Sequence, residues 1–199
     1  ARDEVGSIDL ASNAPPRMLG DHALAAALAA VSRRVDASGL AAYGPPGGFL
    51  EHRRAVAAWI ALSGLDLPPD ELILCNGAQQ GLAAALLAAS PNGVRAAVYT
   101  EAMTFPGFLR YASLNGHRVH GVPFDEEGIH PTALDRALSQ RRPPTAQALI
   151  YITPTLHNPT TATMGRRRRR DIVRVARTHD AAIVEDDVYA LSQDRDAAS

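Results

Sequence analysis

The residues most suggestive of chemistry lie in the segment AAIVEDDVY, residues 181–189. A short apolar run of strand length is followed directly by three acids, of which Asp186 is the second, and then by Tyr189. Buried carboxylates are costly without a cationic partner, and ligands of open α/β sheets bind just outside the carboxyl ends of the strands. Asp186 and Tyr189 therefore form a candidate site for a ligand with a cationic atom. From these residues alone, a polar strand exit with solvated acids is the alternative.

Two other segments place polar groups after predicted strands. The turn at residues 76–80, Asn-Gly-Ala-Gln-Gln, precedes a helix, so its free amides and the positive end of the helix dipole could cradle a phosphate. Asn158 is restricted to extended geometry by Pro159, and its amide could donate to a ligand oxygen. Ordinary turns of α/β proteins carry the same patterns, so both segments leave a purely structural role open.

Aromatic and basic residues allow two interpretations each. Phe105, at a loop-to-helix junction, could stack on a flat ring or act as a hydrophobic staple. The five arginines at 166–170 begin a helix with an apolar face, and we expect them to be its solvated side rather than a nucleic-acid patch. His157 and His179 are isolated, and no spacing indicates a metal site.

The elements that must position these residues alternate in type from residue 70 onward. This alternation predicts an α/β fold, with a mostly parallel sheet and helices on both faces. The expected strands are 72–75, 96–99, 118–122, 148–152 and 182–185. The expected helices are 22–35, 49–63, 81–89, 105–115, 131–139 and 165–178. Because the polar tail holds no further strand, we expect the chain to be the N-terminal portion of a longer fold.

The composition is that of a soluble globular protein, with 199 residues, 46% hydrophobic and 21% charged. The net charge of −1 favours no nucleic-acid partner, and no apolar run approaches the roughly 18 residues that a membrane span needs. The single cysteine, Cys75, favours a reducing, cytoplasmic location. All 20 basic residues are arginine, so only an N-terminal amine could form a Schiff base.

Six stretches, in their order along the chain, resemble the fold-type I pyridoxal-phosphate enzymes, and among these the class I and II aminotransferases. They are Tyr43-GPPGG-FLEHRRAVAAWI, NGAQQGL, TEAMTFPGF, Asp125-EEGIHP, TPTLHNPTTATMGRRRR and IVEDDVY. The subgroup they resemble includes the aminoadipate-type aminotransferases and the effector domains of MocR/GntR-type regulators. The resemblance implies an incomplete cofactor-binding large domain at residues 49–199. An N-terminal arm, a helix and a Tyr/Gly/Pro loop would precede it at residues 1–48.

The resemblance implies pyridoxal 5′-phosphate as the cofactor. Asp186 would pair with the protonated pyridine nitrogen and keep the ring electron-accepting. Tyr189 and Asn158 would hydrogen-bond the phenolic oxygen of the ring. These implied roles agree with what the residue types could do by themselves.

The resemblance also assigns the remaining contacts of the cofactor. Ala78 and Gln79 would bind the phosphate through amides at the start of a helix, with the Gln79 side chain adding a contact. Phe105 would stack on the ring. Tyr43 resembles a tyrosine that reaches across a homodimer interface to the phosphate held by the partner.

The chain departs from the family pattern at several positions. Relatives have a hydroxyl residue where Ala78 stands, and commonly have Tyr for Phe105, Pro for Met103 and Gln for His157. The family's Schiff-base lysine and carboxylate-binding arginine would lie beyond Ser199. The chain therefore holds no catalytic residue of its own, and we expect it to be inactive alone.

The resemblance implies amino-group transfer between an amino acid and a 2-oxo acid in a full-length, homodimeric protein. The alternative is the effector-sensing domain of a MocR/GntR-family transcriptional regulator, which would contact DNA only through a domain upstream. A naturally truncated chain with a structural role is a third possibility.

Overall fold

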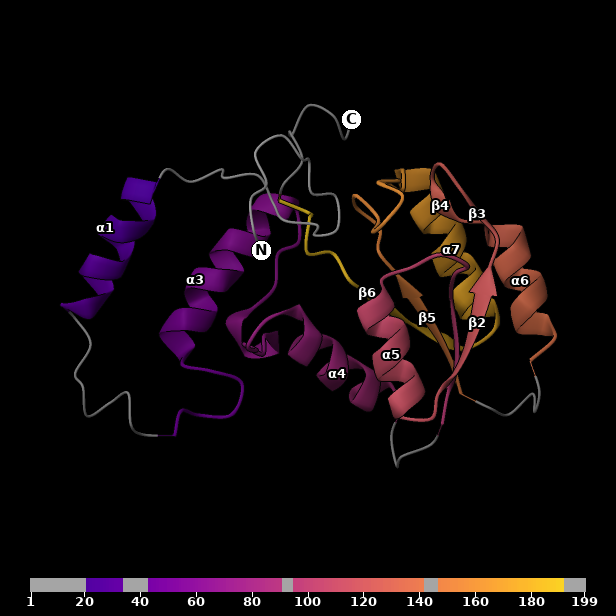
Figure 1. Ribbon diagram of the computed structural model, residues 1–199, viewed down its shortest axis with the longest axis horizontal. Helices are drawn as coiled ribbons and strands as arrows, with labels where there is room; N and C mark the ends of the chain where they lie inside the picture. The colour runs from indigo at the N-terminus through magenta and orange to yellow at the C-terminus, as the bar shows by residue number, and fades with distance from the viewer. Residues whose placement is uncertain (1–20, 34–42, 91–94, 142–146, 192–199) are drawn as a thin grey trace, which may run out of the picture. The chain divides into compact units, whose positions relative to one another are not determined.

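The computed structural model describes residues 21–33, 43–90, 95–141 and 147–191 (Figure 1). The chain divides into two units, Ala1–Gly44 and Pro45–Ser199. Helix α1 (Asp21–Ser32) is the described element of the first unit, and residues 34 and 35 of the expected helix lie outside the described residues. The domain boundary expected between residues 48 and 49 stays a prediction.

The second unit begins with three consecutive helical segments. These are α3 (Leu50–Ile60) and the 3-10 turns η1 (Ala61–Ser63) and η2 (Pro69–Glu71). Arg53 of α3 connects this helix to the preceding loop and to η2. Its side chain donates to the carbonyl of Gly48 at 3.2 Å and to that of Pro69 at 2.9 Å. Gly64 ends the helical stretch in a left-handed conformation, directly after the expected helix 49–63.

The expected strand at 72–75 is wrong. The segment is extended, and the amide of Leu74 donates to the carbonyl of Gly47 at 2.9 Å, but no described strand lies beside it. An apolar run becomes a strand only when a neighbouring strand takes up its alternating amides and carbonyls. The sequence pattern of the segment could not show whether that neighbour is present.

The sheet contains four parallel strands in the order β2-β1-β5-β6, which confirms the predicted architecture. Their bounds are β1 Ala97–Glu101, β2 Arg118–Val122, β5 Ala148–Ile152 and β6 Ala181–Glu185. The turn that follows β2 forms a small antiparallel hairpin of β3 (Phe124–Asp125) and β4 (Gly128–Ile129). Every residue of β1 and β5 is buried, as expected of central strands covered on both faces.

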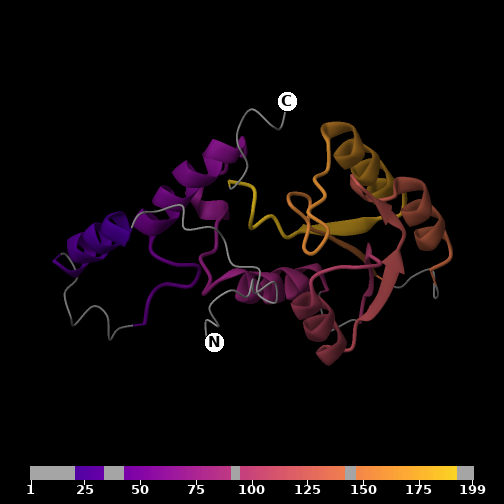
Figure 2. The same cartoon turned by 45° about the horizontal axis from the view of Figure 1, so that its top comes forward.

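Helices cover both faces of the sheet (Figures 1 and 2). On one face lie α4 (Ala78–Ala89) and α5 (Pro106–Leu114), and on the other lie α6 (Pro131–Ser139) and α7 (Arg166–Thr178). Side chains of β5 alternate between them: Leu149 and Tyr151 pack with α4 and α5, while Ile150 and Ile152 pack with α6 and α7. This doubly covered sheet fixes the strand ends from which the candidate site residues follow.

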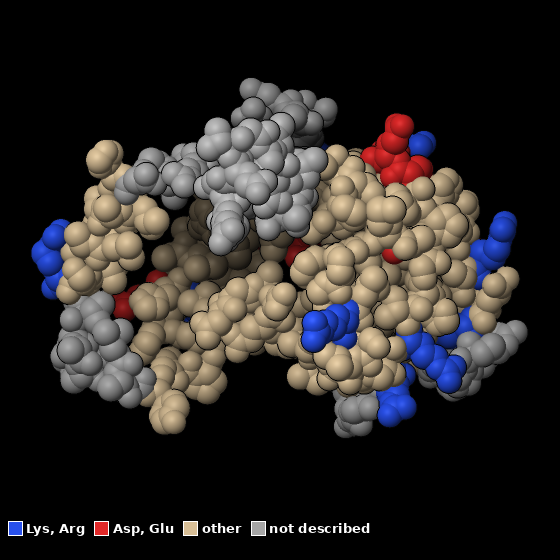
Figure 3. All heavy atoms as spheres, in the orientation of Figure 1, with Lys and Arg blue, Asp and Glu red and all other residues tan. Residues whose placement is uncertain are grey.

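The expectation for the five arginines that open α7 is partly wrong. Arg166, Arg167 and Arg170 are exposed as expected, but Arg169 is half-buried and Arg168 is only 8% exposed. The guanidinium of Arg168 donates to the Asp125 carboxylate at 2.8 and 3.0 Å, and to the carbonyls of Gly128 and Ile129 at 2.9 Å each. Figure 3 shows acidic side chains gathered over this β3–β4 hairpin. Arg168 therefore anchors the hairpin to α7.

The helices of the described residues include none with the length and apolarity to cross a membrane.

Candidate functional site

A pocket of about 120 Å³ lies at the carboxyl ends of the central strands. It is lined by residues of the first turns of α4, the start of α5 and the segments that follow β5 and β6. Six of the seven residues predicted as a site line it together with Leu82, Thr153 and Val188, namely Ala78, Gln79, Phe105, Asn158, Asp186 and Tyr189. The pocket thus brings together residues that are up to 111 positions apart, from Ala78 to Tyr189 (189 − 78).

Asp186 is held by the strand next to its own. Its amide donates to the carbonyl of Ile152 at 2.9 Å and continues the pairing of β6 with β5. The hydroxyl of Tyr151 donates to Oδ2 of Asp186 at 2.8 Å. A donor at this distance fixes the orientation of the Asp186 carboxylate at the pocket.

Tyr151 was not predicted as part of the site. Its side chain is fully buried, and its ring stacks on that of Phe108 with centroids 3.6 Å apart and planes 6° apart. Burial and the carboxylate of Asp186 raise the pKa of Tyr151, so the phenol stays protonated and remains a donor. The sequence could have indicated this role, because Tyr151 is a single tyrosine in an otherwise apolar strand. The hydroxyl of a buried tyrosine requires a hydrogen-bond partner.

Replacing Tyr151 with phenylalanine is expected to weaken the ligand affinity of the pocket while keeping the fold. The change removes only the hydroxyl that donates to Asp186, and a hydrogen bond to a charged group contributes about 1.5–3 kcal/mol. We expect a loss of about tenfold in the affinity for pyridoxamine 5′-phosphate, measured by calorimetric titration. Tyr111→Phe, on the half-buried side of α5, is the control. Unchanged affinity in Tyr151→Phe would contradict the assigned role.

The start of α4 has the features of an anion site. Gly77 precedes the helix with φ of +84°, a conformation that glycine adopts without strain, and no side chain caps the helix. The Gln80 side chain instead accepts from the amide of Asn76 at 2.6 Å. Ala78 and Gln79 are exposed, so their end of the helix is accessible to a ligand. The helix begins at Ala78 rather than at residue 81, which makes the predicted turn three residues shorter.

An aromatic ring and an unpaired hydroxyl also line the pocket. Phe105 immediately precedes α5, is half-buried and packs against the core beneath α4 and α5. Gly107 permits this placement, because an added Cβ there would collide with the Phe105 ring. Thr153, which the sequence did not single out, is 3% exposed, and its hydroxyl has no hydrogen-bond partner among the described residues. That hydroxyl is available to a polar ligand atom.

Asn158 lines the pocket from a loop held at both sides. The amide of His157 donates to the carbonyl of Ala162 at 2.8 Å, and the amide of Thr161 donates to the carbonyl of His157 at 2.6 Å. The Asn158–Pro159 peptide bond is cis. Asn158 is half-buried, with its backbone between two anchored residues. Asn158 thus lines the pocket, and the donation of its amide to a ligand oxygen stays a prediction.

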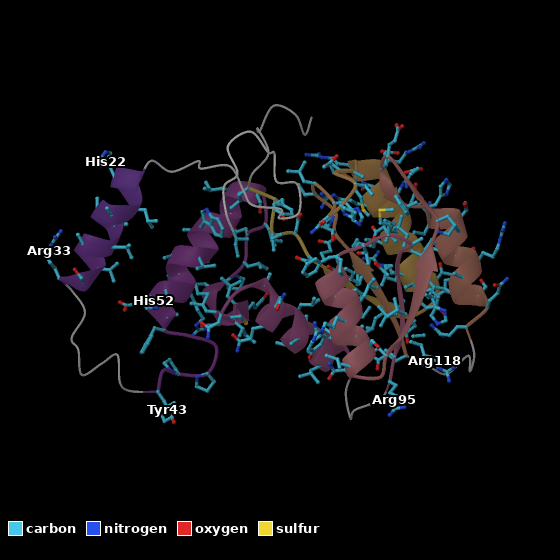
Figure 4. The ribbon with its side chains drawn as sticks, in the orientation of Figure 1. His22, Arg33, Tyr43, His52, Arg95 and Arg118 are labelled. Carbon is cyan, nitrogen blue, oxygen red and sulfur yellow. The ribbon has the colours of Figure 1, made fainter. Side chains whose placement is uncertain are left out.

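Tyr43 and Tyr189, the two predicted tyrosines, differ in their surroundings. Tyr189 is half-buried and lines the pocket. Tyr43 belongs to the first unit, and its side chain is fully exposed (Figure 4). Its expected role at a partner's site stays a prediction.

Within the described ranges, no group of three or more His, Cys, Asp or Glu residues could hold a metal ion.

The sequence matches a known protein family. A family model described as aminotransferase class I and II matches residues 5–194. The chain belongs to this family. It is 29% identical over 147 residues to the 2-aminoadipate transaminase of Thermus thermophilus, covering 74% of this chain and 34% of that protein. It is also 28% identical over 159 residues to YdfD of Bacillus subtilis, an uncharacterized HTH-type transcriptional regulator, covering 80% and 31%.

Among solved structures, this chain is similar to LysN, the α-aminoadipate aminotransferase of Thermus thermophilus complexed with N-(5′-phosphopyridoxyl)-L-leucine. The TM-score is 0.67 at 26% identity, over 84% of this chain and 40% of LysN. The chain spans about a third of the length of the two curated relatives, which are covered at 34% and 31%. The relatives thus include both classes that the resemblance implied, aminotransferases and HTH-type regulators.

Proposed function

We propose that this chain is the part of a pyridoxal-phosphate-dependent aminotransferase that holds the cofactor, and that the whole protein transfers an amino group between an amino acid and a 2-oxo acid. The observation that carries this proposal is the pocket in which the Asp186 carboxylate, fixed by Tyr151, lies with the uncapped start of α4. A negative charge and a helix N-terminus suit a ligand with a cationic ring atom and a phosphate.

The residues around the pocket fit pyridoxal 5′-phosphate in number and kind. Asp186 would hold a proton on the pyridine nitrogen, and Phe105 would cover a face of the ring. Asn158 and Tyr189 would donate to the phenolic oxygen. The amides of Ala78 and Gln79 would bind the phosphate. When bound, this cofactor supplies an electron-accepting ring for chemistry at the amino acid's α-carbon.

The chain supplies binding and orientation rather than a covalent attachment. All of its basic residues are arginines, so no ε-amino group can form a Schiff base. We therefore propose that these 199 residues bind the cofactor noncovalently and are catalytically inactive by themselves.

The second candidate is the effector-sensing domain of a MocR/GntR-type regulator. The similarity to YdfD, an HTH-type regulator, over 80% of this chain favours it. The same pocket would then bind the cofactor, and DNA would be contacted through a different domain. Pyridoxal-phosphate-dependent DNA binding of the full-length protein in a gel-shift assay would support the regulator. Transamination by that protein would support the enzyme.

Two further features of the whole protein belong to this proposal. We propose a homodimer in which Tyr43 reaches the phosphate held by the partner. Sedimentation of a full-length protein as a monomer would contradict it.

We also propose a cytoplasmic location, because a chain whose single cysteine is free has no disulfide that would need an oxidising compartment.

Titration with pyridoxamine 5′-phosphate tests the binding role directly. This probe carries an amine in place of the aldehyde, so it cannot form a Schiff base with the N-terminal amine. We expect saturable one-to-one binding, at least about tenfold tighter than binding of pyridoxamine, because the phosphate contacts the helix start. Inorganic phosphate serves as the control for the phosphate contact alone. Equal, non-saturating heats for all three ligands would refute the proposal.

A further inference from the structure

A second and larger cavity lies at the opposite end of the sheet from the candidate site. This space, the arginine cavity, has a volume of about 560 Å³ and is lined mainly by residues at the amino ends of β1 and β2 and at the C-terminal ends of α5 and α6. Three of these residues are arginines, Arg95, Arg118 and Arg141, and none of the described residues that line it is acidic. Its volume lies in the range of about 300–1,000 Å³ that is usual for small-molecule sites.

The pairing of β1 with β2 places the strand side chains of this cavity on one face of the sheet. Arg118 is the partner of Ala97, and His120 is the partner of Tyr99. Paired residues of neighbouring strands point to the same face, and Ala97 and Tyr99 pack in the core beneath α6 and α7. Arg118 and His120 therefore lie on the α6 side, where the ring of His120 stacks on that of Tyr99 with centroids 4.9 Å apart. The arginine cavity thus has a buried aromatic ring in its wall.

The three arginines come from three different segments of the chain. Arg95 lies two residues before β1, and Arg118 is the first residue of β2 (Figure 4). The side chain of Arg95 lies over Gly116, because a Cβ on that glycine would be 2.9 Å from Nε of Arg95. Arg141 follows α6, and its Nη1 donates to the carbonyl of His179 at 3.4 Å. Segments that are far apart in the sequence therefore direct three guanidinium groups to one space.

The positive charge of this cavity is not neutralised within the part of the chain that the structure describes. Arg95 and Arg118 are exposed, and neither side chain has an ion pair or a hydrogen bond to another described residue. The whole chain carries 20 basic and 21 acidic residues, so three arginines without an acid are a local feature. Burial raises the pKa of Tyr99, and the charge of Arg141 acts against that rise. The positive field therefore reaches the wall of the cavity, where it attracts anions.

Capping of the nearby helix ends does not explain this group of arginines. Basic side chains near a helix C-terminus can donate to its last carbonyls. Backbone amides already do so here, from residues 140 and 141 to α6 and from residues 115–117 to α5. Of the three arginines, only Arg141 has a contact of this kind, with the carbonyl of His179 after α7. The positions of Arg95 and Arg118 therefore favour an anionic ligand over a capping role.

We propose that the arginine cavity binds a small molecule that carries at least two phosphate or carboxylate groups. A guanidinium can donate two parallel hydrogen bonds to either group, and three guanidiniums around one space can hold more than one such group. Pyridoxal 5′-phosphate does not fit this cavity, because it has a single phosphate and no lining carboxylate could hold a proton on its ring nitrogen. The cavity shares no residue with the candidate cofactor pocket, so the proposal is independent of the proposed function.

Calorimetric titration of the 199-residue chain with inorganic pyrophosphate tests this site. We expect saturable one-to-one binding, at least about tenfold tighter than that of inorganic phosphate, because pyrophosphate offers two groups to the guanidiniums. Arg95→Gln and Arg118→Gln should each weaken it about tenfold, and the double variant should abolish it. Arg110→Gln, which changes an exposed arginine of α5 on the other face of the sheet, should bind as wild type does. Citrate, titrated in the same way, distinguishes a carboxylate ligand from a phosphate ligand.

Four results would overturn the proposal. They are no binding of pyrophosphate or citrate, equal affinities for pyrophosphate and phosphate, equal losses in Arg110→Gln and Arg118→Gln, and pyrophosphate binding that is unchanged in the double variant. The last of these would place the anion elsewhere, such as at the start of α4. Duplex DNA that binds through Arg95 and Arg118 while the small anions do not would assign the arginines to a nucleic acid.

Two further measurements separate this site from the fold and from the cofactor pocket. Because Arg95 and Arg118 are exposed, their variants should melt within about 2 °C of wild type, so a loss of binding is not a loss of the fold. Arg118→Gln should bind pyridoxamine 5′-phosphate as wild type does. If wild type binds pyrophosphate as expected but not pyridoxamine 5′-phosphate, the proposed function fails and the anion site stands.

Discussion

Asp186→Asn is expected to weaken binding of pyridoxamine 5′-phosphate by about 100-fold, which corresponds to about 2.7 kcal/mol. The amide is nearly isosteric and can still accept the Tyr151 hydroxyl at Oδ1, so the pocket keeps its shape. It carries no charge, however, and cannot stabilise a protonated pyridine nitrogen. Loss of the anionic partner of a buried cation costs several kcal/mol, whereas loss of a neutral contact costs about one.

Calorimetric titration of Asp186→Asn and Glu185→Gln measures this effect with a matched control. Glu185 is the neighbouring acid at the end of β6, is exposed and does not line the pocket. We expect its variant to bind as wild type does. Wild-type affinity in Asp186→Asn would contradict a role for this carboxylate in binding. Equal losses in both variants would show that the total local charge, rather than this carboxylate, determines binding.

Arg168→Met is expected to lower the free energy of unfolding by about 2–3 kcal/mol, mainly because the buried carbonyls of Gly128 and Ile129 lose their donor. The guanidinium is 9% exposed and contacts the Asp125 carboxylate and the carbonyls of Gly128 and Ile129. It also donates to Glu127 at 3.3 Å. Methionine keeps the volume of the apolar stem but satisfies none of these acceptors.

Urea unfolding of Arg168→Met and Arg167→Met measures the contribution of this one position in the arginine run. Arg167 is exposed, and its substitution is expected to change stability by no more than about 0.5 kcal/mol. The hydrogen bonds from Arg168 lower the pKa of Asp125, so this part of the stability is lost as the pH falls below about 4. Arg168→Met should remove that acid sensitivity. Similar stabilities of the two variants would contradict the anchoring role.

The sequence predicted the parallel part of the fold well, because the pattern of each element is local. Strands 118–122 and 148–152 and helix 131–139 have the predicted bounds, since apolar runs and a proline at the first helical turn mark them. The segment 72–75 has the same local pattern as a strand. Its failure to form one depends on a neighbour, and a neighbour cannot be read from so short a segment.

The candidate site shows the same division between local and distant information. Four predicted residues gather because they follow parallel strands that end at one edge of the sheet, and the start of α4 adds the other two. Tyr151 was missed because its partner is 35 residues away (186 − 151). Arg168 was misassigned because five identical residues hide which of them faces the hairpin.

The stacked pair of Phe108 and Tyr151 connects the packing of the core with the ligand affinity of the pocket. Tyr151 is a core side chain on the α4–α5 face and also the donor to the pocket acid. A substitution that repacks this core would therefore alter the charge that the pocket offers, even though it touches no ligand. Substitutions that change the stability of the fold around the Tyr151 ring would therefore also change the ligand affinity, so the two properties would evolve together.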